Sequence, residues 1–487
     1  MRKNINYIAV FFALMLIVLL TVYIATPTQE LTELDIYSLQ QSVDNEDEDV
    51  IADFLLYEVE VPAIVDWDED IIATLLSARE ETDKLTSESE LLRKFPYPFR
   101  AMVCITTDCD DMTIESFLRI HRFLNTFEYT SYGRGLGLDI ANSFFMFNAS
   151  PCRPHQATWF AGTNPNMLRD AEFIQKFWEV GWIDAIHTFG DFSAVPGITF
   201  FTRELGLAAW EALEEAGIQP TVWIDHGDES NVQNFGASNF IVSPDSFFAF
   251  QQGDDPNSLF YHTDVTLAGS VRFVWHSRHS HQFGSYFPLT ARSVRDGQMI
   301  WNFYRYTSDI RPNGSIDWTW SPDRLRDQIT EARLDELEYR GQYAVIAQHL
   351  NFEHVQMGEP DIVALRMLAY RFHETQTILV TRTSRLLAYA VAQRYVVFKY
   401  VQKDGYTGIF IVGIDDPTTG FREPLPYELK GLTFYTDNPE STIIFVGDTY
   451  LRPCEIQING SDQTGRLSVS IPWFEQDTFD YAQLWGN

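Results

Sequence analysis

Short apolar segments alternate with helical segments from about residue 98 to residue 395, and this alternation restricts the chain to few folds. Segments of strand length lie at residues 100–107, 142–148, 182–186, 221–225, 271–275, 299–306, 343–348 and 377–381. Amphipathic helices are expected at residues 113–127, 167–181, 202–217, 321–341 and 359–375. Strands joined through helices pair in parallel, so the pattern predicts an α/β fold. Seven or eight such units favour a (β/α)7–8 barrel over an open sheet, and we expect it to span residues 96–396.

The pattern changes after a helix at residues 384–393. Short alternating segments separated by Gly, Asp, Asn and Pro follow, as is typical of an all-β module. We therefore expect a C-terminal β-sandwich domain at residues 397–487.

The N-terminus carries an uncharged apolar segment at residues 7–25 that follows Arg2 and Lys3. Its length matches a bilayer core of about 30 Å, and the two cations keep the N-terminus cytoplasmic. Residues 1–27 are thus predicted to be a transmembrane anchor that places the rest outside the cytoplasm; a cleaved signal peptide with secretion is the alternative. Residues 28–95, rich in Asp, Glu, Ser and Thr, are expected to be an acidic linker with some helix.

The net charge argues against a nucleic-acid partner. The chain has 68 acidic and 35 basic residues, a net charge of −33, and no cluster of Lys and Arg. A protein that binds the phosphate backbone needs a concentrated basic surface.

Polar residues that suit catalysis or metal binding follow several predicted strands. They are Asp108, Asp110 and Asp111 after the first strand, His187 and Asp191 after the third, Asp225 and His226 after the fourth, and His349 after the seventh. Active sites of β/α barrels lie at the carboxyl ends of the strands, so these side chains are expected to meet. Asp and His are common ligands of divalent metal ions.

The stretches "TTDCDD", "HTFGD" and "IAQHLN" resemble motifs of the polysaccharide deacetylase (NodB-homology) family, carbohydrate esterase family 4. This distant resemblance covers roughly residues 98–395 and implies a distorted barrel with a divalent metal site. It implies the removal of N- or O-acyl groups from a cell-surface or extracellular polysaccharide. The metal would be zinc, with cobalt, manganese, nickel or iron as alternatives.

The resemblance also assigns roles to individual residues. Asp108 would be the catalytic base, His349 the catalytic acid, and Asp110, His187 and Asp191 the metal ligands. In the alternative register, an Asp-Asp pair, Asp110 would be the base and Asp111 the ligand. Asp191 stands where the family has a second His. The family's Arg-x-Pro-aromatic motif has no clean match, and Arg272 is a weak substitute for its arginine.

Other interpretations of these residues stay open. Asp225 and His226 either contact substrate or a metal, or only hold a turn. Aspartates after a strand often cap the next helix, and Asp111 or Thr113 could have only that role for the helix at residues 113–127. His187 or His349 could likewise have only a structural role. At the level of function, the alternatives are a carbohydrate-binding or assembly protein without activity, and a glycosidase, which needs two carboxyl groups across a pocket.

Overall fold

The computed structural model describes residues 66–80, 90–150, 152–192, 201–226, 231–236, 251–276 and 281–485. The predicted anchor at residues 1–27 lies outside these residues, as does most of the predicted linker. No helix in the described part of the chain has the length and apolar character needed to cross a membrane. Residues from Asp66 onward belong to one compact unit.

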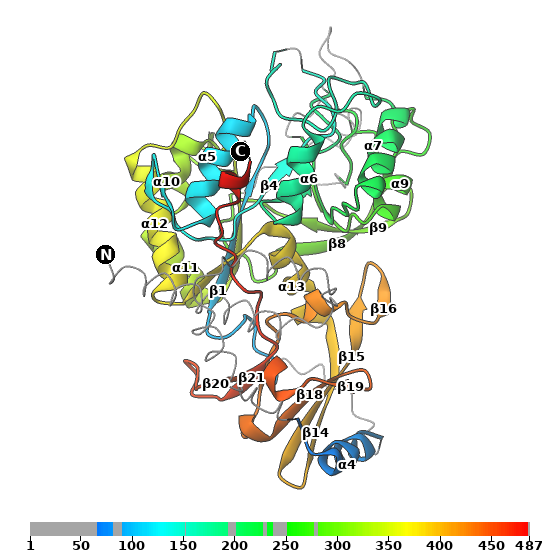
Figure 1. The fold of residues 1–487 in the computed structure, drawn as a ribbon, viewed down its shortest axis with the longest axis vertical. Helices are drawn as coiled ribbons and strands as arrows, with labels where there is room; N and C mark the ends of the chain where they lie inside the picture. The colour runs from blue at the N-terminus through cyan, green and yellow to red at the C-terminus, as the bar shows by residue number, and fades with distance from the viewer. Residues whose placement is uncertain are drawn as a thin grey trace, which may run out of the picture. The chain divides into compact units, whose positions relative to one another are not determined.

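A large sheet, mainly parallel, forms the centre of this unit (Figure 1). Its order is β12 (Tyr343–Gln348), β1 (Ala101–Thr107), β4 (Asn142–Phe144), β5 (Ile183–Ile186), β6 (Val222–Ile224), β7 (Phe273–Trp275), β9 (Met299–Phe303) and β8 (Leu289–Ser293), with β13 (Ile378–Val380) also paired to β1. Only β8 runs antiparallel to its neighbour within these ladders. The expected α/β class with a parallel sheet is therefore confirmed.

The ladders of the described residues do not close the sheet into a barrel, which differs from the expectation. The end strands β12 and β8 do not pair with each other. After β9 the chain enters a hairpin of β10 (Ser308–Ile310) and β11 (Ile316–Trp318) and does not continue as a ladder along β12. Single bridges join Tyr306 to Ile346 and Ser285 to Tyr343.

Helices separate most of the parallel strands. They are α5 (Ile114–Asn125), α6 (Ala171–Glu179), α7 (Arg203–Glu215), α9 (Thr263–Ala268), α10 (Leu325–Gln328), α11 (Glu331–Arg340), α12 (Glu359–His373) and α13 (Thr383–Tyr395). The single helix expected at residues 321–341 is broken at Ile329, because Thr330 starts a new helix and its hydroxyl accepts a hydrogen bond from the Arg333 amide. Gly341 ends α11 in the left-handed conformation, which glycine adopts without strain.

The strands bury both faces, which explains their continuous apolar sequences. On β1, Met102 and Cys104 belong to a cluster that includes Leu386 and Leu387 of α13. Val103, between them, belongs to a second cluster with residues of α5 and α12. Because successive side chains of a strand point to opposite faces, α13 covers one face while other helices cover the opposite one.

Two smaller sheets follow α13. One contains β14 (Val396–Lys403), β15 (Tyr406–Asp416), β16 (Gly420–Arg422), β18 (Thr442–Val446) and β19 (Thr449–Tyr450); the other contains β17 (Thr433–Tyr435), β20 (Gln457–Asn459) and β21 (Ser468–Ser470). Phe398 of the first sheet contacts Phe434 of the second, with ring centroids 5.1 Å apart. Helix α4 (Glu69–Glu80), which lies in the predicted linker, buries Leu75 against Phe410 and Phe445.

A buried neutral histidine predicts a pH-dependent stability. Nε2 of His262 donates to the Gln233 carbonyl at 2.7 Å and Nδ1 accepts from the Thr266 hydroxyl at 2.8 Å. Burial lowers the pKa of His262 from 6.5 to about 4, so below the ordinary value the unfolded chain binds a proton that the folded chain does not. This residue should therefore reduce the free energy of unfolding by about 2 kcal/mol between about pH 7.5 and pH 5.

Urea denaturation at both pH values measures this loss. In His262→Gln the loss should be smaller by that amount, although the variant is less stable at either pH. An equal pH dependence in both proteins would contradict the prediction.

Candidate metal centre

The carboxyl ends of four parallel strands bring together residues far apart in the sequence. Asp108 and Asp110 follow β1, His187 follows β5, His226 follows β6 and His349 follows β12. Because these strands are parallel, their carboxyl ends lie at one edge of the sheet. The Asp108 amide donates to the Gln348 carbonyl at 2.8 Å, which ties the turn after β1 to the end of β12.

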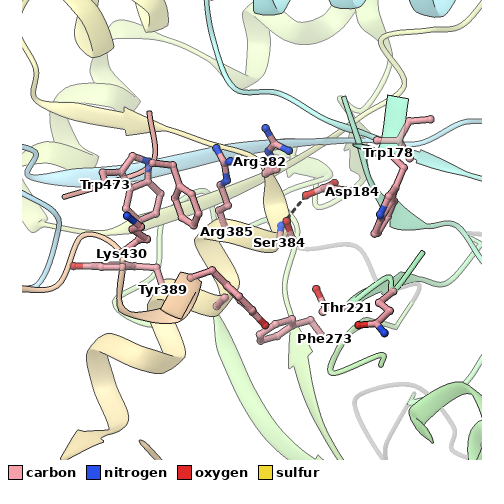
Figure 2. A pocket seen from close by; sticks show the side chains of 15 residues that line it. Trp178, Asp184, Thr221, Phe273, Arg382, Ser384, Arg385, Tyr389, Lys430 and Trp473 are labelled. Carbon is pink, nitrogen blue, oxygen red and sulfur yellow. Dashed lines mark hydrogen bonds between the residues drawn. The ribbon is translucent and has the colours of Figure 1, made fainter. Parts of the chain in front are cut away.

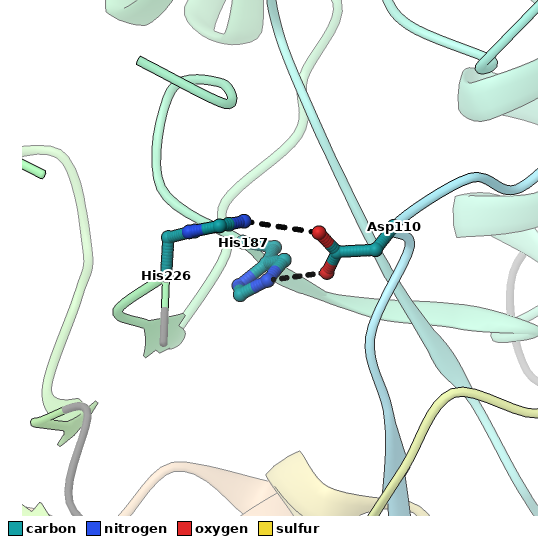
Figure 3. Close-up of side chains that lie close together, drawn as sticks. All are labelled: Asp110, His187 and His226. Atoms are coloured by element: carbon teal, nitrogen blue, oxygen red, sulfur yellow. Dashed lines mark hydrogen bonds and ion pairs between the residues drawn. The ribbon is translucent and has the colours of Figure 1, made fainter. Parts of the chain in front are cut away.

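Asp110 lies at the centre of the cluster (Figure 3). Its Oδ2 is 3.1 Å from Nε2 of His187, and its Oδ1 is 3.0 Å from Nε2 of His226. Arg153 also donates to Oδ1 at 2.8 Å. Asp110 is 4% exposed, so these partners offset the cost of burying its charge.

The hydrogen bond at Nδ1 of His187 determines whether Nε2 of the neutral ring carries a proton. Nδ1 lies 3.0 Å from the Ile224 carbonyl, which only accepts hydrogen bonds, so Nδ1 carries a proton. In the neutral ring, Nε2 then presents a lone pair to the Asp110 carboxylate. Two acceptors at this distance require a cation between them or a second proton on the ring, and a backbone carbonyl behind a histidine is the usual support for a metal ligand.

The electrostatics of the cluster also favour a cation. Burial would raise the pKa of Asp110, but His226 and hydrogen bonds from three histidines hold it well below its usual value. Burial would lower the pKa of His226, but the charges of Asp110 and Asp191 raise it to about 9. Asp110, His187 and His226 offer one carboxylate oxygen and two imidazole nitrogens within 4.8 Å of one another, so these residues can hold a metal ion.

A second group shares Asp110 and adds Asp108 and His349. Nε2 of His349 lies 3.4 Å from Oδ2 of Asp110 and 3.8 Å from Oδ2 of Asp108. The His349 ring contacts both Trp320 and Phe352, with ring centroids at 4.6 and 4.7 Å. These contacts aim Nε2 at the two carboxylates.

Arg305 fixes the orientation of Asp108. Its two terminal nitrogens donate to the two carboxylate oxygens at 2.5 and 2.9 Å, and both side chains are almost fully buried. The guanidinium carbon lies 3.7 Å from the ring centroid of Trp275. Burial would raise the pKa of Asp108, but Arg305, His187 and His349 lower it below the ordinary value. Asp108 is therefore an oriented carboxylate.

Two predicted ligands lie at or beyond the edge of the cluster. The nearest distances of Asp191 are 3.6 Å to Arg153 and 3.8 Å to Nε2 of His226. Asp111 has a positive φ of 54°, and its carboxylate lies 3.9 Å from His354. Of the two residues that the sequence offered as the cap of α5, Asp111 and Thr113, the structure has Thr113, whose hydroxyl accepts from the Ser116 amide.

Two residues predicted to contact substrate, Asp225 and Arg272, interact with other groups of the protein. Asp225 is fully buried, and its Oδ1 accepts from Trp223 and from the Phe235 amide. Burial raises its pKa well above the usual value, which favours a neutral carboxyl group. Arg272 pairs with Asp416 at 3.0 Å and Glu428 at 2.9 Å, so its charge is used there and not at Asp108.

Two arginines of the cluster, Arg305 and Arg153, were not among the predicted site residues. His226 was predicted only as a contact to substrate or a metal, or as part of a turn. Arg305 follows β9, so the strand-end rule that found the aspartates could also have found it. Arg153 lies in the irregular segment after β4, where no such rule applies. His226 stands one strand away from His187, so spacing along the sequence could not show that both contact Asp110.

No protein-family model matches the chain, and neither does any curated protein. The chemistry of the cluster is therefore inferred from its own geometry.

Loss of a ligand should abolish stoichiometric metal binding. We expect the purified full-length protein, stripped with a chelator, to bind about one Zn²⁺ per chain in a calorimetric titration. His187→Ala should weaken binding by more than about 100-fold, since it removes a ligand and not merely a residue that supports one. Asp111→Asn is the matched control, because it changes an adjacent acid outside the cluster; equal loss in both variants would contradict the assignment.

Proposed function

We propose that the protein is a metal-dependent hydrolase that removes N- or O-acyl groups from a cell-surface or extracellular polysaccharide. The proposal rests on one observation above all. A buried carboxylate, Asp110, contacts Nε2 of two histidines, and Nδ1 of His187 donates to a carbonyl. Beside this set lie a carboxylate and a histidine in reach of the same space, Asp108 and His349.

The donor set fits a divalent ion that prefers nitrogen and oxygen, and zinc suits it best. Asp110, His187 and His226 would hold the ion, with Asp191 at the edge as a further carboxylate. Bound there, the ion would acidify water and polarise an acyl carbonyl. A set of three protein ligands is also typical of catalytic zinc sites, because it keeps a position open.

Asp108 is suited to accept a proton. Arg305 engages both of its oxygens, yet each carboxylate oxygen keeps a second lone pair for another partner. The lowered pKa of Asp108 keeps it ionised at neutral pH. Its role would be to take the proton of an attacking water molecule.

His349 is suited to donate a proton to the leaving group. Its Nε2 faces Asp108 and Asp110, and Trp320 and Phe352 hold the ring. A proton on Nε2 can pass to a leaving sugar oxygen or amine.

Aromatic side chains near His349 support a carbohydrate substrate. Trp320 contacts the His349 ring, and Trp318 at the end of the β10–β11 hairpin is 47% exposed. Apolar faces of sugar rings stack on such side chains. The resemblance to polysaccharide deacetylases points to the same substrate class, and the Tyr306 bridge to β12 is compatible with the distorted barrel of that family. We also propose the membrane-anchored, extracytoplasmic location expected from residues 7–25.

A glycosidase is the less favoured alternative. Its acid catalyst needs a carboxyl group with a raised pKa facing a second carboxylate. The pKa values of Asp108 and Asp110 are both lowered, and Asp225, whose pKa is raised, is bonded to Trp223. A carbohydrate-binding protein without activity is also less favoured, because it needs no base, whereas Arg305 holds Asp108 in the orientation that a base requires.

Acetate release is the direct test. The zinc-loaded full-length protein should release acetate from acetylated glycans, and Asp108→Asn should reduce the rate by about 10²- to 10⁴-fold while it retains the metal. His187→Ala should lose both metal and activity. Asp111→Asn should keep both.

Three other outcomes would count against the proposal. New reducing ends without acetate would indicate a glycosidase. Glycan binding without either product, in a metal-loaded protein, would indicate a binding protein. Acetate release that survives in both Asp108→Asn and His187→Ala would place the activity elsewhere.

Arg305→Lys tests how Asp108 is held. Lysine keeps the positive charge but cannot engage both carboxylate oxygens at once, so the base should lose its fixed orientation. We expect kcat to fall by about 10-fold or more, with metal content and KM little changed. Arg272→Lys serves as the control, because that arginine pairs with Asp416 and Glu428; an equal fall in kcat would contradict the role of Arg305.

A further inference from the structure

A cavity of about 280 Å³ lies away from the metal centre (Figure 2). Its walls include Ile183, Thr221 and Phe273, at or just before the amino ends of β5, β6 and β7. The metal centre lies at the carboxyl ends of the same strands. The two sites are thus at opposite ends of the sheet.

The charge of the cavity is opposite to that of the chain. Its charged lining residues are three cations, Arg382, Arg385 and Lys430, and one acid, Asp184. Asp184 is buried and accepts a hydrogen bond from the Ser384 amide at 2.8 Å, so it is engaged by the first turn of α13. Three cations around one cavity are unexpected in a chain with a net charge of −33, and they need a structural or a functional reason.

The two arginines share one carboxylate. Nε of Arg382 and Nη1 of Arg385 donate to different oxygens of Asp139, at 2.8 and 2.9 Å. Gly181 makes room for Arg382, since a Cβ at this glycine would lie 1.3 Å from the guanidinium. Asp139 therefore positions both guanidinium groups but supplies one negative charge for two positive ones.

Lys430 differs from the two arginines in its partners. It is half-buried, and among the described residues no group lies within hydrogen-bonding or ion-pairing distance of its Nζ. Next to it, Gly431 has a positive φ of 83°, and a Cβ there would meet the Trp473 ring at 2.5 Å. The Trp473 ring therefore packs directly against the backbone of Gly431, next to Lys430.

Aromatic side chains form the rest of the wall. The Tyr389 ring centroid is 5.5 Å from that of Trp473, and the Phe474 centroid is 5.1 Å from it. The guanidinium carbon of Arg385 lies 4.0 Å from the centre of the Phe474 ring. A cavity lined by cations and by flat apolar rings suits a ligand with a negative group on a ring.

We propose that this cavity is a second binding site, and that it takes a small organic anion. The ligand's carboxylate or phosphate group would lie against Lys430 and Arg385, and its ring would lie against Trp473. The ring can belong to an aromatic acid or to an acidic sugar, since both present a flat apolar face. The site is independent of the proposed hydrolase activity.

Calorimetric titration of the full-length protein with matched probes tests the proposal. Benzoate and glucuronate combine a ring with an anion; benzyl alcohol and methyl glucoside keep the ring without the charge; inorganic phosphate has the charge without the ring. We expect saturable binding of benzoate, glucuronate or both, at least about 10-fold tighter than of the neutral or ring-free probes. Tighter binding of benzoate would identify the ligand as an aromatic acid, and tighter binding of glucuronate would identify it as a sugar acid.

Lys430→Gln should weaken binding of the ring anion by about 10-fold, and Arg385→Gln should do the same if its melting temperature shows that it folds. Lys403→Gln is the matched control, because Lys403 is exposed at the end of β14 and outside the cavity. His187→Ala should bind the probe as wild type does, which separates this cavity from a carboxylate bound at the metal centre.

Equal binding of charged and neutral probes would overturn the proposal, as would phosphate binding as tightly as the ring anions. Binding that is lost in His187→Ala but kept in Lys430→Gln would place the anion at the metal centre and would also overturn it.

Discussion

The buried carboxylate of Asp110 is the constraint that organises the carboxyl edge of the sheet. A charge that is 4% exposed is costly unless polar groups surround it, and here Arg153 and three histidines do so. Each partner is placed by its own backbone: His187 and His226 follow neighbouring strands, and His349 follows the strand on the other side of β1. A change in the register of any of these strands would leave the charge uncompensated.

Asp108, two residues earlier, is also buried, but its charge is compensated in a different way. A single arginine engages both of its oxygens, and that arginine lies over the Trp275 ring. Asp110 is thus contacted by Arg153 and by three imidazoles, which a metal ion can use, whereas both oxygens of Asp108 are engaged by a single guanidinium group. This difference in partners, in one short turn, separates the proposed ligand from the proposed base.

The two ends of the sheet have opposite characters. Histidines and aspartates meet at the carboxyl ends of the strands, where a cation is favoured. Helix α13 and the chain segments that carry Lys430 and Trp473 lie at the amino ends of β5 to β7, where an anion is favoured. The acidic composition therefore does not predict the character of the cavity, because net charge averages over the whole chain.

The sequence by itself determined the α/β class, the positions of the parallel strands and the expectation that polar residues at their ends meet; the antiparallel strand β8 and the β10–β11 hairpin were not predicted. The predicted features follow from the period of apolar residues and from short turns, which are local properties. Tertiary structure decided that His226 joins His187 at Asp110, and that Arg305 and not Arg272 is the partner of Asp108. The order of the strands in the sheet and the direction of each side chain set these pairings. Both depend on contacts between segments far apart in the chain. The same holds for the cavity at the other end of the sheet, whose lining comes from residues 178–474 and which no local pattern marks.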